Sequence, residues 1–391
     1  MLAREGHNVR FSNVRSKSLS LDKIESLIRV NIEAKSQQYE ALIEQGVLRS
    51  AGVYVRELLP NSKRFFTVTV SPVRRLFGKE LQRSFESAGL EHHFIEMPDG
   101  ERKKNLGTIE DLGTKLVKLG ADRSSALIAL GGGVVGDVVG FLASIYMRGI
   151  HFVQIPTTFL AQVDSSVGGK TGVNLAVGKN LLGTFRQPQL VLTDPEVLVT
   201  LPEREYRSGL YEALKYGIIR NPRIFEFMEN NRDRILKRDP GTLEWLIAEC
   251  VRVKASVVSE DEKDFGVRRI LNLGHTIGHA LEAETRYTHF LHGEAVAWGI
   301  VAASMISVGM QKTDSATAQR IISAILAYAP LPRVDVRSKS VAKRIGKDKK
   351  TIDNKVHFIL PVEIGRVEIE SDVPERAVIQ SIEELRYLSK A

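Results

Sequence analysis

The sequence predicts a chain of two parts, an α/β N-terminal half and an all-α C-terminal half. In the first half, short apolar runs alternate with helical patterns, which is typical of a largely parallel sheet covered by helices. After Pro202, long segments with helical spacing replace the strand patterns. The chain has 391 residues, of which 43% are hydrophobic, enough for two domains with buried cores. We therefore expect a tail at 1–25, an α/β domain at 26–200 and a helical domain at 201–391.

Five strands are expected in the first half. They are 65–70, 91–96, 126–130, 152–155 and 190–193. Helical patterns lie between them, for instance at 106–119, where apolar residues recur with a period near 3.6. Ligands of such a sheet bind at the carboxyl ends of its strands, so the residues that follow these strands are candidates for a site.

The second half is expected to be mainly helical. The predicted helices are 205–219, 222–237, 241–260, 270–285, 294–311 and 315–327. A strand-like apolar run at 356–360 and a helix at 375–388 close the chain. The sequence shows no internal repeat and no low-complexity segment.

Composition narrows the classes of protein to consider. Cys250 is the only cysteine, which excludes an intrachain disulfide and favours a cytoplasmic protein. No apolar run approaches the roughly 18–20 residues of a membrane helix, and we expect the basic, serine-containing segment 1–25 to be poorly ordered. The net charge of +8 fits either a solvated basic surface or attraction of small anions. Nucleic-acid binding is not expected, because the aromatic residues are scattered.

Two glycine-rich turns follow apolar runs of the first half. Gly131–Asp137 (GGGVVGD) continues the strand predicted at 126–130, and a strand, glycine turn and helix in succession let backbone N–H groups approach a phosphate. A second glycine pair stands between Asp164 and Lys170, and we expect Lys170 at the carboxyl end of a sheet strand. The two turns suggest a nucleotide site beside a second anion site, although a glycine triplet also occurs in plain strand–helix turns.

Metal-ligand types gather in the second half. His275 and His279 are spaced i, i+4 on a predicted helix, His292 follows, and Glu212 lies one helical turn before Lys215. Neutral imidazoles and a carboxylate suit Zn²⁺ or a similar divalent ion. A lone histidine is more simply a hydrogen-bonded polar residue, but three within 18 residues favour a metal site. From local spacing, His275 and His279 form the obvious chelate, and the absence of a glutamate between them disfavours a metalloprotease.

Eight motifs occur in a characteristic order. They are GGGVVGD (131–137), YMRG (146–149), PTT (156–158), QVDSSVGGKTGVN (162–174), GKN (178–180), EALK (212–215), NLGHTIGHALE (272–282) and LHGE (291–294). Together they resemble the sugar-phosphate cyclase superfamily, and most closely the 3-dehydroquinate synthase family, over residues 28 to 388. The resemblance implies an α/β N-terminal NAD-binding domain, an all-α C-terminal metal-binding domain and an active site between them.

The resemblance also implies a reaction. Members of the family convert 3-deoxy-D-arabino-heptulosonate 7-phosphate into 3-dehydroquinate and phosphate, in the shikimate pathway to the aromatic amino acids. NAD⁺ and a divalent metal (Zn or Co) take part. Oxidation, elimination of phosphate, reduction and an intramolecular aldol closure follow one another, so this carbon–oxygen lyase is redox-neutral. A cytoplasmic homodimer that takes a small sugar phosphate, with no nucleic-acid or membrane partner, is expected.

The resemblance assigns site residues position by position. The metal ligands would be Glu212, His275 and His292, which moves His279 from the metal to the substrate or its phosphate. The NAD contacts would be Asp99, Gly100, Glu101, Arg102, Lys103, Lys104, Gly133, Val134, Val135, Gly136, Asp137, Thr157, Thr158, Lys170, Lys179, Val197, Leu198, Val199 and Thr200. The catalytic and substrate contacts would be Arg148, Asp164, Lys170, Asn180, Lys215, Lys254, Arg268, Asn272, His279 and Lys349. In the family, the arginine that matches Arg268 can reach the site of the neighbouring subunit.

Some positions depart from the family pattern, and other functions stay open. Val70 and Pro72 stand where many members carry acidic and amide residues near the adenosine, and Asp264 stands where a glutamate is more usual. Three alternatives remain: a related cyclase acting on another sugar phosphate, a metal-dependent polyol dehydrogenase that releases NADH, and an inactive NAD- or metal-binding regulator. Arg268 and Lys254 favour a substrate that bears a carboxylate, and hence the dehydroquinate product.

Overall fold

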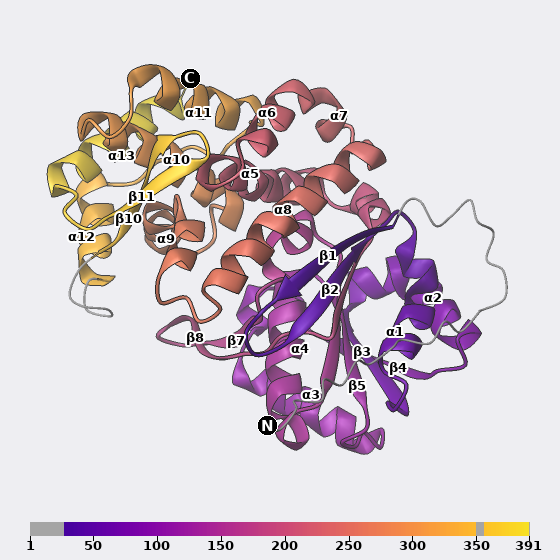
Figure 1. The fold of residues 1–391 in the computed structure, drawn as a ribbon. Helices are drawn as coiled ribbons and strands as arrows, with labels where there is room; N and C mark the ends of the chain where they lie inside the picture. Colours follow the sequence, from indigo (N-terminus) through magenta and orange to yellow (C-terminus); the bar gives the residue numbers. More distant parts are fainter. Residues whose placement is uncertain (1–26, 349–355, 391) are drawn as a thin grey trace, which may run out of the picture.

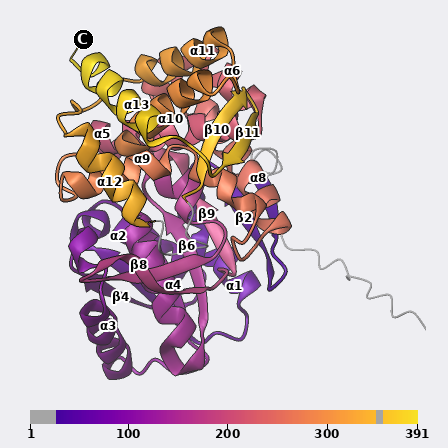
Figure 2. The same cartoon turned by 90° about the vertical axis from the view of Figure 1, so that its left-hand side faces the viewer.

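The computed structural model describes residues 27–348 and 356–390. A sheet region formed by the N-terminal half lies against a helical region formed by the C-terminal half (Figure 1, Figure 2). The predicted tail at 1–25 and the predicted substrate contact Lys349 lie outside the described residues. The two-part fold class predicted from the sequence is therefore confirmed.

The sheet region is built on one seven-stranded sheet with the order β1-β2-β9-β6-β5-β3-β4. Its strands are β1 (Ile28–Glu33), β2 (Gln38–Ile43), β3 (Arg64–Val70), β4 (Glu91–Met97), β5 (Ala126–Gly131), β6 (His151–Pro156) and β9 (Leu190–Thr193). The five predicted strands are all present, each within one residue of its predicted bounds. β1 pairs antiparallel with β2, and the other neighbours pair in parallel.

Helices on both faces explain the continuous apolar runs of the central strands. In β3, Phe66 and Val68 join a core on one face, while Phe65 joins a core on the other, so both faces of the strand are buried. The helices of this region are α1 (Ala51–Leu58), α2 (Ser71–Ser87), α3 (Leu106–Lys118) and α4 (Gly133–Ile145). The strands β1 and β2 were not predicted, because their exposed or half-buried positions carry polar residues such as Arg29, Glu33 and Glu40.

A separate hairpin, β7 (Lys170–Leu175) and β8 (Gly178–Phe185), was also not predicted. It packs along α4 and forms its own two-stranded sheet. Gly168 and Gly169, with φ angles of 93° and 68°, turn the chain out of the main sheet before it. Lys170 is consequently the first residue of the hairpin, and its predicted place at the carboxyl end of a sheet strand is wrong.

The helical region contains most of the predicted helices. They are α5 (Glu203–Ile219), α6 (Pro222–Asn230), α7 (Arg232–Leu236), α8 (Pro240–Glu260), α9 (His275–Glu284), α10 (His292–Gly309), α11 (Ser315–Ala327), α12 (Ser338–Asp348) and α13 (Glu375–Leu388). The helix predicted at 222–237 is broken at Asn231, and the one predicted at 270–285 begins only after Gly274, whose φ is 81°. A hairpin, β10 (Phe358–Glu363) and β11 (Arg366–Glu370), adds a small sheet to the otherwise helical region.

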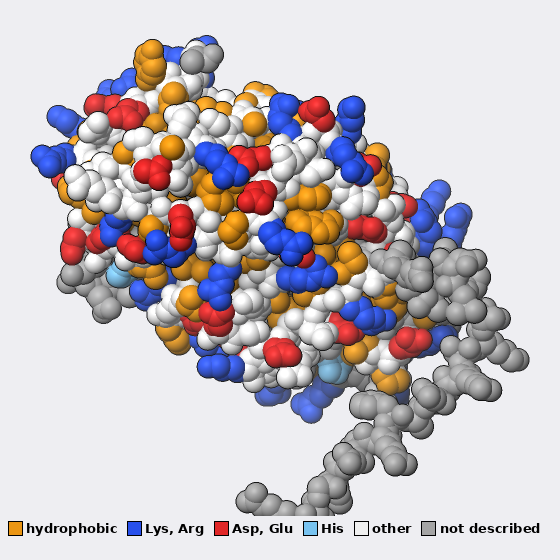
Figure 3. Space-filling model, turned by 45° about the horizontal axis from the view of Figure 1, so that its top comes forward, with side chains coloured by type: hydrophobic (Ala, Val, Ile, Leu, Met, Phe, Trp, Pro, Cys, Tyr) orange, Lys and Arg blue, Asp and Glu red, His pale blue; other side chains and the backbone are white. Residues whose placement is uncertain are grey.

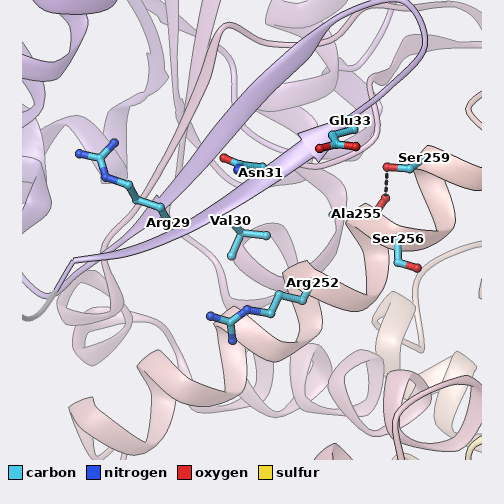
Figure 4. Close-up of a pocket in the computed structure, with 8 residues that line it drawn as sticks. All are labelled: Arg29, Val30, Asn31, Glu33, Arg252, Ala255, Ser256 and Ser259. Carbon is cyan, nitrogen blue, oxygen red and sulfur yellow. Dashed lines mark hydrogen bonds between the residues drawn. The ribbon is translucent and has the colours of Figure 1, made fainter. Parts of the chain in front are cut away.

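The two regions meet where α8 packs on β1. Figure 4 shows a groove between them, with Arg29 and Glu33 on the strand and Arg252 and Ser259 on the helix. On the face drawn in Figure 3, acidic and basic side chains are interspersed. Within the described part of the chain, no helix is both long and apolar enough to span a membrane.

Candidate active site

The carboxyl ends of four parallel strands bring together the predicted NAD contacts. β4 leads into Asp99–Lys104, β5 into Gly133–Asp137, β6 into Thr157 and Thr158, and β9 into the 3₁₀ helix Pro195–Thr200. Because these strands are parallel, all four segments lie at one edge of the sheet. Segments spread over about 100 residues of sequence thus form one surface.

The glycines after β5 allow close packing, and they also lead into the partly exposed N-terminus of α4. A Cβ at Gly131 would lie 2.6 Å from the Val135 side chain, and one at Gly132 would lie 2.9 Å from Thr158, so close packing alone requires these two glycines. The first turn of α4 is nevertheless partly exposed, and no side chain of the described residues caps it. Its N–H groups are therefore available to an anion such as a pyrophosphate.

Lys104 ties the tip of the β7–β8 hairpin to this edge of the sheet. Its Nζ lies 2.5 Å from Asp137 Oδ2 and 2.5 Å from Asn180 Oδ1, and its side chain is only 4% exposed. Burial raises the pKa of Asp137, against the opposing charge of Lys104. Two predicted NAD contacts and one predicted substrate contact thus share one hydrogen-bonded cluster.

Glu212, His275 and His292 come together from three helices, α5, α9 and α10. The Nε2 atoms of His275 and His292 each lie 3.8 Å from Glu212 Oε1. Ligands of one tetrahedral ion with bonds of about 2.1 Å would be roughly 3.4 Å apart, so a small contraction would close this set around a metal. Glu212 is fully buried, and apart from its ion pair with Lys215 neither of its oxygens accepts a hydrogen bond among the described residues. These donors therefore fit a divalent cation.

Backbone contacts set the spacing of the three helices. A Cβ at Gly293 of α10 would lie 1.8 Å from the carbonyl oxygen of Ser208 in α5. A Cβ at Gly299 would lie 1.9 Å from the carbonyl oxygen of Gly274, the residue before His275. The main chains of α5, α10 and the start of α9 thus touch directly beside the ligands.

The neighbouring histidines differ in how they are held. His275 Nδ1 donates to the Leu273 carbonyl oxygen at 3.1 Å, which leaves Nε2 unprotonated and directed at Glu212, and burial keeps its pKa well below the usual value. His279 lies beside them, since the ligand atoms of the three histidines are all within 4.8 Å of one another. His279 is exposed, however, whereas His275 and His292 are half-buried. The spacing thus admits both the local chelate and the set that the resemblance implies.

A buried chain of charges continues from Glu212. Lys215 forms an ion pair with Glu212, and Lys254 forms one with Asp164, whose Oδ1 also accepts a hydrogen bond from Tyr216 at 2.9 Å. Burial alone would lower the pKa of Lys215, but Glu212 and Asp164 raise it. Burial lowers the pKa of Lys254 to about 8. Three predicted substrate contacts thus lie in contact with the metal-ligand cluster or with one another.

Arg268 and Lys170 come from opposite sides of the junction. Arg268 is 2% exposed and donates from Nη2 to the Gly168 carbonyl oxygen at 3.0 Å and from Nη1 to the Glu262 carbonyl oxygen at 2.6 Å. Lys170 forms an ion pair with Asp264. Within its own chain the guanidinium of Arg268 is buried and held by two carbonyl oxygens, and the expectation that it reaches a neighbouring subunit stays a prediction.

Arg148 is not brought into this site. It is exposed and lies just before β6 begins, so it stands at the amino ends of the parallel strands. The 13-residue helix α4, which separates it from Gly133, spans about 20 Å. The predicted substrate contact of Arg148 therefore stays a prediction, since Arg148 lies away from the site of its own chain.

The remaining predicted positions lie on the surface or in the first elements of the sheet region. Asn272 is exposed at the end of the 3₁₀ helix Val267–Asn272, and Lys179 at the hairpin tip lies 3.5 Å from Glu282. Val70 is buried, and Pro72 lies in the first turn of α2. Both side chains are apolar and therefore offer no hydrogen-bond acceptor to an adenosine.

Sequence reasoning assigned no role to two buried carboxylates near the site. Glu282 lies 3.5 Å from His292 Nδ1 and is shared with Lys179. Glu262 contacts the sheet region from the loop after α8. Glu282 ends the quoted motif NLGHTIGHALE, which was a usable signal, while Glu262 stands in an acidic run that looks like a solvated surface.

Comparisons with known proteins find relatives of both halves of the chain. Residues 94–208 match the family model "3-dehydroquinate synthase N-terminal" and residues 209–351 match "3-dehydroquinate synthase C-terminal". The chain is 60% identical to the 3-dehydroquinate synthase of Koribacter versatilis over 361 residues, 92% of this chain and 99% of that protein.

Solved structures have the same fold. A 2-deoxy-scyllo-inosose synthase complexed with carbaglucose-6-phosphate, NAD⁺ and Co²⁺ is 27% identical with a TM-score of 0.82, over 91% of this chain and 99% of that one. The 2-epi-5-epi-valiolone synthase of Streptomyces hygroscopicus subsp. jinggangensis, with NAD⁺ and Zn²⁺ bound, is 26% identical with a TM-score of 0.82, over 97% and 99%. The family models and the identity to a full-length relative assign the chain: it belongs to the 3-dehydroquinate synthase family.

Proposed function

We propose that the chain converts 3-deoxy-D-arabino-heptulosonate 7-phosphate into 3-dehydroquinate and phosphate. The observation that carries the proposal is the buried carboxylate of Glu212, which faces two histidines and pairs with Lys215. A site that joins metal donors to buried cations suits a substrate with hydroxyls, a carboxylate and a phosphate.

Glu212, His275 and His292 would hold the metal, with Zn²⁺ or Co²⁺ as the candidates, and the carboxyl edge of the sheet would hold NAD⁺. When bound, the metal supplies Lewis acidity toward the substrate hydroxyls, and NAD⁺ supplies the hydride acceptor. Lys215 would donate a hydrogen bond to a hydroxyl at the reacting carbon, because its Nζ already lies against the ligand carboxylate. His279, exposed beside the cluster, would contact the substrate.

The remaining cations would orient the substrate anions. Lys254 and Arg268, both buried on the helical side, would bind the carboxylate. Lys170, Asn180 and the N–H groups near them would bind the phosphate from the hairpin side. A substrate held at both ends would keep its reacting carbon fixed between the metal ligands and the cofactor surface.

A homodimer would explain Arg148. The resemblance makes it a substrate contact, yet it lies exposed and far from the site of its own chain. We infer that it serves the site of a second copy. Mixing the inactive variants Arg148→Ala and Lys215→Met should then restore activity, to about one quarter of wild type, because half of the dimers would contain one complete site. If Arg148 acts within its own subunit, the activity of the mixture will be only the mean of the activities of the two variants.

The reaction itself is tested by stoichiometry. Purified protein with catalytic NAD⁺ and Zn²⁺ or Co²⁺ should release one phosphate for each heptulosonate phosphate consumed, without net NADH. Accumulation of NADH in step with substrate loss would instead identify a polyol dehydrogenase. Turnover of glucose 6-phosphate or sedoheptulose 7-phosphate, with none of the heptulosonate phosphate, would identify a related cyclase.

A further inference from the structure

Glu262 lies at the junction of the two regions, although it belongs to neither the metal-ligand cluster nor the NAD edge. Figure 4 shows the end of α8 beside the end of β1, with Ser259 near Glu33. Three residues further along each segment, Glu262 meets Ser36. Glu262 is 4% exposed, so its carboxylate is removed from water.

The carboxylate of Glu262 binds the sheet region through three donors. Oε2 accepts from the Ser36 backbone N–H at 3.0 Å, and Oε1 accepts from the Ser36 hydroxyl and from Gln187 Nε2 at 3.0 Å. Burial alone would raise the pKa of Glu262, but these donors lower it, so the group is held as the anion. A charged acceptor with three donors forms a stronger connection than neutral hydrogen bonds would.

Two partners of Glu262, Gln187 and Arg268, touch the loop that precedes Lys170. The Gln187 side chain packs on Gly169, where a Cβ would lie 2.7 Å from it. The Glu262 carbonyl oxygen accepts from Arg268, which donates in turn to the Gly168 carbonyl oxygen. The Gly168 N–H donates to the Tyr39 hydroxyl at 3.1 Å, so Gly168 is held from both sides.

We propose that Glu262 is a positioning residue, which holds the Gly168–Lys170 loop of the sheet region in register with Arg268 of the helical region. It touches neither the substrate nor the metal. It fixes the distance between a phosphate-binding and a carboxylate-binding cation, and thereby selects a substrate with its two anions at that spacing. This proposal rests on the proposed function of the same site.

The test exchanges the two partners. In Glu262→Gln, an amide group faces donors that need acceptors, and loss of a charge-assisted hydrogen bond should raise the KM for the heptulosonate phosphate about 10- to 100-fold. The kcat should change less than about threefold, because the lost contact acts equally in the ground and transition states. Glu262→Gln combined with Gln187→Glu restores one carboxylate and one amide, and should return the KM to within about threefold of wild type.

Glu260→Gln is the matched control, since Glu260 is exposed at the end of the same helix, pairs with Arg220 and accepts a hydrogen bond from Ser256. Its KM should equal that of wild type. A Glu262→Gln variant with unchanged KM would overturn the proposal. The proposal would also be overturned if Glu262→Gln lost kcat and NAD affinity and the added Gln187→Glu did not restore them. Glu262 would then have a merely structural role.

A second measurement is independent of turnover. Hydrogen exchange of peptides that cover 166–172 should be faster in Glu262→Gln and should return to the wild-type rate in the exchanged pair. Unchanged exchange would contradict the positioning role, even if the single variant folds poorly in other regions. If wild-type protein fails to consume the heptulosonate phosphate, the proposed function fails, and the exchange data still decide the role of Glu262.

Discussion

Histidines with little exposed surface occur in both regions of the molecule, and they are held in different ways. In the sheet region, His92 Nε2 lies 2.6 Å from Thr67 Oγ1 and Nδ1 lies 3.0 Å from Gln82 Oε1. Both nitrogens therefore have neutral partners, and the ring packs against Phe85, with the centroids 4.4 Å apart. In the helical region, His275 satisfies only Nδ1 and directs Nε2 at Glu212.

The difference distinguishes a structural histidine from a ligand. A ring with both nitrogens bonded to neutral groups contributes packing and hydrogen bonds and has no capacity left for a metal. A ring with one free nitrogen beside a buried carboxylate has that capacity, and the backbone bond at the other nitrogen fixes its orientation. Sequence does not make this distinction, since histidine pairs stand in both regions.

The largest effect is expected from removing a proposed ligand. His275→Ala and His292→Ala should lose the metal and lower kcat/KM by at least about 10³-fold, or roughly 4 kcal/mol, because the substrate hydroxyls lose their Lewis acid. His279→Ala should keep nearly stoichiometric metal while turnover falls. Metal analysis of the purified variants, with the visible spectrum of the Co²⁺ forms, checks this. Loss of metal from His279→Ala together with its retention in His292→Ala would show that the ligand set is wrong.

A cation from the sheet region should matter almost as much. Lys170→Met should lower kcat/KM by at least about 100-fold, or roughly 2.7 kcal/mol, because a phosphate contact is lost while the fold remains. Steady-state kinetics measures the loss of kcat/KM, and circular dichroism checks that the fold remains. Activity within about tenfold of wild type would remove Lys170 from the mechanism.

His92 should affect stability and its dependence on pH. Burial lowers the pKa of His92 to about 4, so below pH 6.5 the unfolded chain takes up a proton that the folded chain does not. Stability is therefore lost as the pH falls, by about 2 kcal/mol between pH 7 and pH 5 from this residue. Urea unfolding at the two pH values should show a drop that is smaller by this amount in His92→Gln. An equal drop in both proteins would show that His92 is not the titrating group.

The smallest effect is the change in the free energy of unfolding that we expect when the metal is removed. Free metal at about ten times its Kd should stabilise the folded chain by about 1.4 kcal/mol, and a chelator should abolish the gain. Thermal unfolding with and without the chelator measures it. His92→Gln should show the same gain, whereas Glu212→Gln should show none. A gain that survives in Glu212→Gln would place the stabilising ion elsewhere.

Sequence patterns predicted the central strands well because both of their faces are buried, which produces continuous apolar runs such as that of β3. The strands β1 and β2 and the β7–β8 hairpin were not predicted, because polar or exposed residues interrupt them. The neighbourhood of Glu212 could not be seen locally, since it depends on how α5 packs against α9 and α10. Arg148 shows the converse limit, because a matching motif identifies a residue without stating which site it serves.

The contacts of Gly293 and Gly299 have a consequence for ion selectivity. Because main-chain atoms of neighbouring helices touch beside the ligands, the frame that carries them has no side chains to compress or rearrange. An ion that needed its ligands much further apart than the present 3.8 Å could be accommodated only by separating helix backbones, which would disturb the packing of three helices at once. The main chain, rather than the ligands themselves, should therefore set the upper limit on the radius of the ion that this site binds.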